Sequence, residues 1–172
     1  VNSKERSTMR GIIFLITTCI VFNGYADWIQ IGQDIDGEAA NDESGHSVAL
    51  SSDGSVFAIG TMNNDNNGAN SGHVRVYQYT SSIGMWTQLG MDIEGEAAND
   101  QSGHSVALSS DGSIVAIGAL GNDANANGSG HVRVYEYDGI SWTQLGMDIE
   151  GEAVNFEFFG AAVDINADGT IV

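Results

Sequence analysis

The sequence predicts an all-β fold made of repeated sheets, each with four antiparallel strands, and three observations lead to this prediction. A segment that begins with tryptophan occurs three times along the chain. Between these segments lie short apolar or alternating runs, which turn residues separate from one another. The 172-residue chain has 23 glycines and no proline, and runs of Ala, Leu, Lys and Glu at helical spacing are nearly absent after residue 26. These features favour many short strands joined by tight turns.

The repeat sets the domain organisation. The segment that starts at Trp28 returns at Trp86 and again at Trp142, so the two intervals are nearly equal. We therefore expect one domain, residues 27–172, that consists of two full repeats, 28–85 and 86–141, and a partial third repeat, 142–172.

The first two strands of a repeat form a candidate hairpin. In the second repeat they cover residues 105–109 and 114–118, and Asp111-Gly112 lies between them. Asp and Gly both tolerate the positive φ of a tight primed turn, so this dipeptide predicts such a hairpin. The run 114–118 is continuously apolar, which predicts burial on both faces.

The third and fourth strands follow a polar loop. The loop covers residues 121–130, and the third strand, 131–137, places Val132 and Val134 on the face opposite Arg133. After a turn at Asp138-Gly139, the run 142–146 supplies the fourth strand.

Four antiparallel strands in each repeat are typical of the blades of a β-propeller, in which radial stacking covers faces that one blade leaves open. A β-solenoid is the competing architecture, but its coils are shorter. Closed propellers contain about four to eight blades. Because the third repeat is partial, we expect the chain to be part of a longer protein; the alternative is a ring assembled from several copies.

The N-terminal segment 1–26 predicts a signal peptide. Basic residues precede the apolar run 11–22, and the small residues Gly24 and Ala26 follow it, which places cleavage before Asp27. Twelve helical residues rise only about 18 Å, too little to cross a bilayer comfortably. We therefore expect a secreted or cell-surface protein without a membrane span after cleavage, and an uncleaved anchor is the alternative. The single cysteine, Cys19, lies inside the apolar run.

The charge excludes one class of partner. The chain has 23 acidic residues and 5 lysines and arginines, which gives a formal net charge of −18. After residue 26 the only basic residues of this kind are Arg75 and Arg133. Because so acidic a surface repels phosphate backbones, we expect no binding of nucleic acid.

The third repeat resembles the FG-GAP repeat, the unit of the propeller at the head of integrin α chains and of many secreted microbial and algal proteins. The resemblance rests on Phe159-Gly160 together with the run 116–120 of the preceding repeat, and it extends over residues 28–172. The first two repeats have Ser44-Gly45 and Ser102-Gly103 in place of Phe-Gly. The Gly-Ala-Pro element reads Gly60-Thr61-Met62 or Gly118-Ala119-Leu120.

The resemblance also implies a candidate calcium site, because family members often hold Ca²⁺ in an Asp-x-Asp-x-Asp-Gly-x-x-Asp hairpin. The third repeat offers Asp164, Asn166 and Asp168 at the first three ligand positions, but Val172 at the last. In the first two repeats the loop shortens to Ser-Ser-Asp-Gly. A plain Asp-Gly hairpin is the interpretation that we favour, and calcium is the only cofactor that we consider.

The loops between the second and third strands are the candidate ligand-binding sites. Loops on a rigid scaffold are where binding usually resides, and these loops differ more between the repeats than the strands do. Hydrated turns without a ligand are the alternative. The candidate contact residues are Asn64, Asp65, Asn67, Asn122, Asp123 and Asn125. Asn127, in Asn-Gly-Ser, is a candidate glycan acceptor.

No residue pattern predicts a catalytic site. Two histidine positions recur in two repeats, as His46 and His104 and as His73 and His131, which favours a structural role. The connectors 34–38, 92–96 and 148–152 have paired carboxylates, but an enzyme has no need of three copies of its site. We expect solvated connectors there, and a cation shared among their carboxylates is the alternative.

The predicted function is non-catalytic recognition or adhesion outside the cell, with a protein or a polysaccharide as the partner. Two alternatives remain at this point. The chain could be the propeller portion of an extracellular enzyme that acts on polysaccharides, or it could be a structural repeat protein of a matrix.

Overall fold

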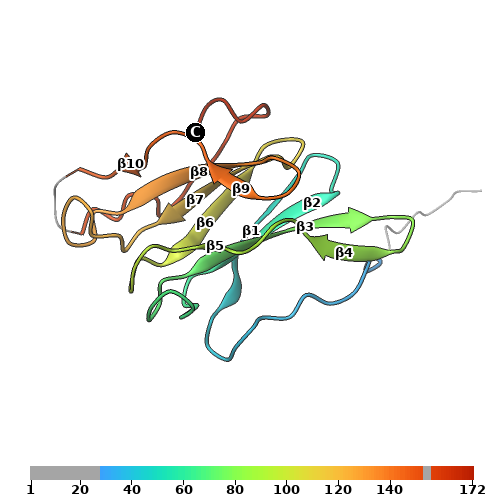
Figure 1. Ribbon diagram of the computed structural model, residues 1–172, viewed down its shortest axis with the longest axis horizontal. Coiled ribbons are helices and arrows are strands. Elements are labelled where there is room, and N and C mark those ends of the chain that lie inside the picture. The colour runs from blue at the N-terminus through green and yellow to red at the C-terminus, as the bar shows by residue number, and fades with distance from the viewer. Residues whose placement is uncertain (1–27, 153–155) are drawn as a thin grey trace, which may run out of the picture. The chain divides into compact units, whose positions relative to one another are not determined.

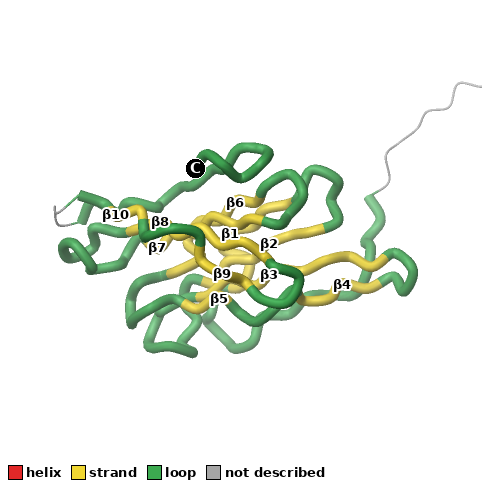
Figure 2. Tube along the Cα trace, turned by 45° about the horizontal axis from the view of Figure 1, so that its top comes forward, coloured by secondary structure: helices red, strands yellow, loops and turns green. Residues whose placement is uncertain are grey.

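A computed structural model describes residues 28–152 and 156–172, and these residues form strands and turns without a helix (Figure 2). The chain divides into two units, residues 1–30 and 31–172, and the strands found in the described residues belong to the second. The predicted signal peptide, residues 1–26, lies outside the described residues. Within the described ranges, a helix with the length and hydropathy needed to cross a bilayer is absent.

The first sheet contains five strands, the first four of which lie in chain order. They are β1 (Ser44–Leu50), β2 (Val56–Thr61), β3 (His73–Thr80), β4 (Met85–Gln88) and β5 (Ile93–Glu94). The strands β1 to β4 pair antiparallel with their sequence neighbours, as predicted for a blade, and β5 pairs with the beginning of β3. The fourth strand is therefore interrupted, and part of the connector 92–96 belongs to the sheet.

The second sheet repeats this arrangement (Figure 1). Its strands are β6 (Ser102–Leu108), β7 (Ile114–Ala119), β8 (His131–Tyr137), β9 (Trp142–Gln144) and β10 (Ile149–Glu150). The register is the same in both sheets, since Ala58 lies opposite Val76 and Ala116 lies opposite Val134. The two blades are therefore equivalent strand by strand.

The hairpin between the first two strands has a different turn from the one predicted. Only the glycine, Gly54 or Gly112, has a positive φ, of 74° in each case, and the aspartate before it does not. The amide of Gly54 donates to the carbonyl of Ser51, and the amide of Ser51 donates to the carbonyl of Val56. This pattern is a four-residue hairpin loop, residues 52–55, built around a type I turn with a left-handed glycine after it, and not a primed turn. The backbone of Asp53 does not adopt a positive φ. Its carboxylate instead accepts a hydrogen bond from the Ser55 amide.

The hydrophobic core lies where the two sheets pack against each other. Valines and isoleucines of the central strands make up most of it, and the apolar run of β7 is buried on both faces, as predicted. Burial of each such side chain contributes about 1.5–3 kcal/mol to the stability of the fold. The buried members are Val56, Ala58, Val74, Val76, Ile93, Val106, Val115 and Ile117.

Two strands of identical sequence show that one blade covers the next. Both β1 and β6 read Ser-Gly-His-Ser-Val-Ala-Leu. Val106 of β6 is 9% exposed because β1 and β2 pack against β6, whereas Val48 of β1 is 68% exposed. The same side chain is therefore buried or exposed according to whether a blade lies in front of it.

Glycines allow the close approach of the blades. A Cβ at Gly60 of β2 would overlap the carbonyl oxygen of Gly103, and a Cβ at Gly118 would overlap that of Gly160. Gly60 and Gly118 begin the Gly-Ala-Pro-like element, and Gly160 belongs to the Phe-Gly pair. The two halves of the repeat motif thus meet across the interface between successive blades.

The third repeat continues the same packing. In the first interface the amide of Ser52 donates to the carbonyl of Ser110, and in the second the amide of Ser110 donates to that of Ala167. The segment 156–172 forms an isolated bridge between Phe159 and Gly130 and a turn at its Asp-Gly pair. It occupies the position of a following first strand.

Candidate functional site

The predicted ligand loops connect β2 to β3 and β7 to β8, and a buried asparagine holds the base of each loop. Asn64 donates from Nδ2 to Asp42 Oδ2 at 3.0 Å, and Asn122 donates in the same way to Asp100 at 3.1 Å. Each asparagine also accepts, through Oδ1, the amide two residues further along the loop. Asn64 and Asn122 therefore fix the loop conformation from inside the protein.

The other four predicted contact residues are exposed and also form internal hydrogen bonds. Asn67 and Asn125 donate to the carbonyl oxygens of Gly95 and Gly151, in the connector that follows their blade. The carboxylates of Asp65 and Asp123 accept backbone amides of their own loops. The loops are thus rigid and joined to the connectors, while ligand contact at these residues stays a prediction.

The candidate glycan acceptor and the candidate calcium hairpin both lie at the surface. The candidate glycan acceptor Asn127 is exposed, and Ser129 of the same motif is buried. In the candidate calcium hairpin, Asp168 accepts hydrogen bonds from Asn166 and Thr170, and Asn166 accepts the amide of Ile171. The same turn positions in the first repeat, Ser51 and Asp53, have equivalent bonds. The loop is closed by its own donors, and calcium at this turn remains an expectation.

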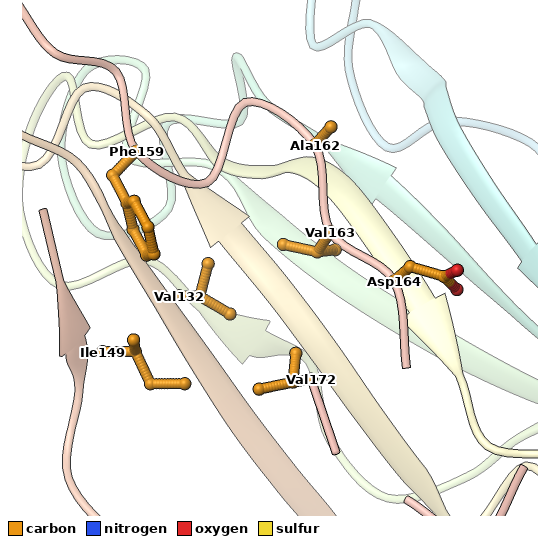
Figure 3. Close-up of a pocket in the computed structure, with 7 residues that line it drawn as sticks. All are labelled: Val132, Ile149, Phe159, Ala162, Val163, Asp164 and Val172. Carbon is orange, nitrogen blue, oxygen red and sulfur yellow. The ribbon is translucent and has the colours of Figure 1, made fainter. Parts of the chain in front are cut away.

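An apolar pocket of about 150 Å³ lies between the second blade and the third repeat. Figure 3 shows Val132, Ile149, Phe159 and Val163 directed toward one another, whereas the carboxylate of Asp164 points away. Val132 and Ile149 correspond to Val74 and Ile93, which are core residues of the first interface. The pocket is therefore a packing position between blades rather than a site with polar recognition groups.

The concentration of charged groups lies elsewhere, at the beginning of β3. His73 and Arg75 are two residues apart, so they share the face opposite the core valines Val74 and Val76. Glu38 from the preceding connector and Asp92 from the following one meet this face. His73 Nδ1 lies 3.6 Å from Asp92 Oδ2 and 3.9 Å from Glu38 Oε2. We call these four residues, Glu38, His73, Arg75 and Asp92, the first charged cluster.

The side chains around the first charged cluster hold its carboxylates in place. Gln88 donates to Asp92 Oδ1 at 2.6 Å. Asn66, from the β2–β3 loop, lies between Glu38 Oε2 and Glu94 Oε1, at 3.4 and 3.5 Å. Burial raises the pKa of Glu94, and the neighbouring Asp92 and Glu38 raise it further. The cluster therefore joins a loop, a strand and two connectors.

The second blade repeats the cluster with a different set of contacts. Arg133 donates from Nε and from one terminal nitrogen to the two oxygens of Asp148, at 3.0 and 2.9 Å, and it also pairs with Glu96. His131 Nδ1 lies 3.7 Å from Asp148 Oδ2. We call Glu96, His131, Arg133 and Asp148 the second charged cluster. Its guanidinium pairs with both carboxylates.

Ionisation in the second cluster follows from these contacts. The hydrogen bonds from Arg133 hold the pKa of Asp148 below its usual value. Burial would lower the pKa of Arg133, but its bonds to Asp148 and Glu96 outweigh this and raise it. Burial, and next the charge of Arg133, lower the pKa of His131. An arginine–dicarboxylate pair beside a neutral imidazole is therefore the stable state.

The sequence interpretation separated residues that the structure brings together. The sequence predicts a structural role for the recurring histidines and solvated acidic connectors, yet Asp92 and Asp148 are only partly exposed and face the histidines. One signal was available. The arginines Arg75 and Arg133 are the only ones after residue 26, and each follows a histidine by two residues. A cationic strand face in so acidic a chain needs carboxylates beside it.

One stretch of the chain is similar to a known protein family. Residues 94–135 match the model of the FG-GAP repeat, in agreement with a chain of FG-GAP or β-propeller type. The matched stretch contains β6, β7 and most of β8, together with Glu96, His131 and Arg133 of the second charged cluster. No curated protein matches the chain.

Proposed function

We propose that the chain is part of a non-catalytic β-propeller outside the cell that recognises a protein or polysaccharide partner. The main support for this proposal is that the two equivalent blades each present one loop at the surface. The loops 62–72 and 120–130 leave corresponding strands in the same register, and they project from the same end of the two sheets (Figure 1). Such an edge offers a row of related surfaces at regular spacing.

The internal bonds of the loops favour recognition. Asn64 and Asn122 fix each loop from beneath, and Asn67 and Asn125 attach it to the next connector. A loop held in this way loses little conformational entropy when a partner binds, and this lowers the free-energy cost of association. The exposed tip residues carry amide and carboxylate groups, which suit the hydroxyl groups of a sugar or the amides of a peptide.

The repetition of the charged clusters supports a non-catalytic role. The described residues place a histidine, an arginine and two carboxylates at the same position of each blade. Catalytic groups need one geometry with distinct acid and base roles. Two clusters of the same residue types at the same strand position are better explained by a role within each blade than by a single catalytic centre.

The sequence features of the N-terminus support a location outside the cell. The basic residues, the apolar run 11–22 and the small residues before Asp27 have the order of a signal peptide. The chain after residue 26 contains no cysteine and is strongly acidic, which suits a hydrated extracellular medium.

A binding experiment with a matched pair of variants tests the proposal. The labelled full chain is applied to an array of neutral and basic polysaccharides and of extracellular-matrix proteins. Ala124→Trp places bulk at an exposed loop tip, and Ser82→Trp places it at the exposed β3–β4 turn. We expect binding to at least one array class, a loss of at least about tenfold in Ala124→Trp and no loss in Ser82→Trp. Absence of binding to every class, or equal binding by both variants, would contradict the proposal.

A further inference from the structure

We propose that Glu38, His73 and Asp92 of the first charged cluster bind a divalent metal ion of the Zn²⁺ type. One imidazole nitrogen and two carboxylates form a ligand set that such an ion accepts, with a water molecule at the fourth position. The ligand atoms of these three residues lie within 4.8 Å of one another. The site differs from the calcium hairpin expected at residues 164–168, since it has a nitrogen ligand and lies in the first blade.

The buried histidine is the first argument for a metal ion. His73 is 0% exposed, and neither of its ring nitrogens has a hydrogen-bond partner among the described residues. An unpaired buried nitrogen destabilises a fold, so a fold rarely retains one without a reason. Nδ1 is directed at Glu38 and Asp92, which are themselves partly exposed. An ion bound to Nδ1 would satisfy this nitrogen and could enter past the carboxylates.

The distances fit a shared ion better than a direct ion pair. A charge-assisted hydrogen bond from a protonated imidazole has an N···O distance of about 2.7–2.9 Å, whereas Nδ1 lies 3.6 and 3.9 Å from the two carboxylate oxygens. Tetrahedral coordination with bonds of about 2.0–2.2 Å separates neighbouring ligand atoms by about 3.4 Å. A movement of a few tenths of an ångström therefore brings both pairs of atoms to the separation in a metal site.

The local charge also favours a divalent cation. Glu38, Asp92 and Glu94 are three carboxylates around His73, and Arg75 is the cationic side chain beside them. With a neutral imidazole and the carboxylates of Glu38, Asp92 and Glu94 ionised, these side chains together with Arg75 have a formal charge of −2. A divalent ion neutralises this charge.

The second charged cluster shows why the first is the better site. Arg133 binds Asp148 through two hydrogen bonds and pairs with Glu96, so its guanidinium already serves as the cation for both carboxylates. Arg75 instead donates to the backbone oxygen of Asp36 and lies 3.6 Å from Glu38. Its Nε lacks a hydrogen-bond partner within the described ranges. Asp92 is consequently available to an ion, whereas Asp148 is not.

Calorimetric titration of the full chain with Zn²⁺, in an excess of Mg²⁺ that saturates weak acidic sites, tests the proposal. Asp92→Asn keeps the shape of the side chain, and Asp148→Asn is the matched change in the second cluster. Circular dichroism confirms that both variants retain the β-sheet signal. We expect one tight Zn²⁺ per chain, at least about tenfold weaker binding in Asp92→Asn, and binding within about threefold of the parent in Asp148→Asn. Equal binding by the parent and Asp92→Asn, or an equal loss in both variants, would overturn the site.

Nuclear magnetic resonance of the imidazole nitrogens identifies the ligand atom independently of any variant. The chain has four histidines, which is few enough to assign them individually. Addition of one equivalent of Zn²⁺ should shift the Nδ1 resonance of His73 and leave those of His104 and His131 in place. An unchanged His73 resonance, or equal shifts at His73 and His131, would contradict coordination by His73.

Discussion

The hydroxyl group of Ser47 in the first blade donates a hydrogen bond of 2.7 Å to the carbonyl oxygen of Gly103 in the second. Ser105 of the second blade donates in the same way, also at 2.7 Å, to Gly160 of the third repeat. The bond therefore recurs with the repeat. It holds the first strand of each blade at the glycine of the next, beside the position where Gly60 or Gly118 permits close approach.

Removal of this bond tests its contribution to the interface. Ser47→Ala should lower the free energy of unfolding by about 1 kcal/mol, because the carbonyl of Gly103 loses a partly buried donor. Ser81→Ala, at an exposed turn position, should change it by less than about 0.5 kcal/mol. Urea unfolding of the full chain measures both values. Equal effects of the two substitutions would show that the bond between blades adds nothing to stability.

The contacts of Arg75 and Arg133 predict that removal of the two side chains lowers the free energy of unfolding by different amounts. Arg133→Met should destabilise the chain by about 2 kcal/mol, because it leaves Asp148 and Glu96 without their cation; solvent access to these carboxylates keeps the cost below that of a fully buried pair. Arg75→Met should cost less, since the contacts of Arg75 are longer and fewer. Urea unfolding of the two variants measures the difference, and a larger cost for Arg75→Met would contradict the assigned contacts.

The sequence predicted the blades well because their signals are local. Alternation in 131–137, the apolar run 114–118 and the Asp-Gly pairs identify strands and turns without knowledge of their neighbours. The interruption between β4 and β5 was missed because it depends on how the connector returns to β3. The charged clusters were missed for the same reason. Glu38 and Asp92 belong to different connectors, far apart in the sequence, and only the fold places both at His73.

The contact of His46 with His104 predicts that the stability of the fold depends on pH. Their ring centroids are 4.9 Å apart, and burial, together with the charge of His46, lowers the pKa of His104. In the unfolded chain His104 has its ordinary pKa of about 6.5, so below that pH the unfolded state takes up a proton that the folded state resists. Stability should fall as the pH is lowered from 7 toward 5.

A variant isolates this contribution. His104→Asn cannot take up the proton, so its free energy of unfolding should fall less between pH 7 and pH 5 than that of the parent. Urea unfolding at pH 7, 6 and 5 gives the two slopes. A steeper fall in the variant than in the parent would show that burial does not oppose protonation of His104.

The N-terminal segment predicts a defined product of secretion. When the full chain is produced in a host with a secretory pathway, N-terminal sequencing of the product in the medium should begin at Asp27, because the small residues Gly24 and Ala26 precede that bond. A membrane-bound product that retains residues 11–22 would instead support an uncleaved anchor.

Paired glycine substitutions test most directly whether the repeats stack as blades. Gly45 and Gly103 occupy the same strand position with φ of 87° and 84°, so alanine strains either backbone by about 1–2 kcal/mol. A Cβ at Gly103 would also lie 2.6 Å from the carbonyl oxygen of His73, whereas a Cβ at Gly45 meets nothing within 4 Å. Urea unfolding should therefore show that Gly103→Ala costs about 1–3 kcal/mol more than Gly45→Ala. Equal costs would contradict the stacking of one blade on the next.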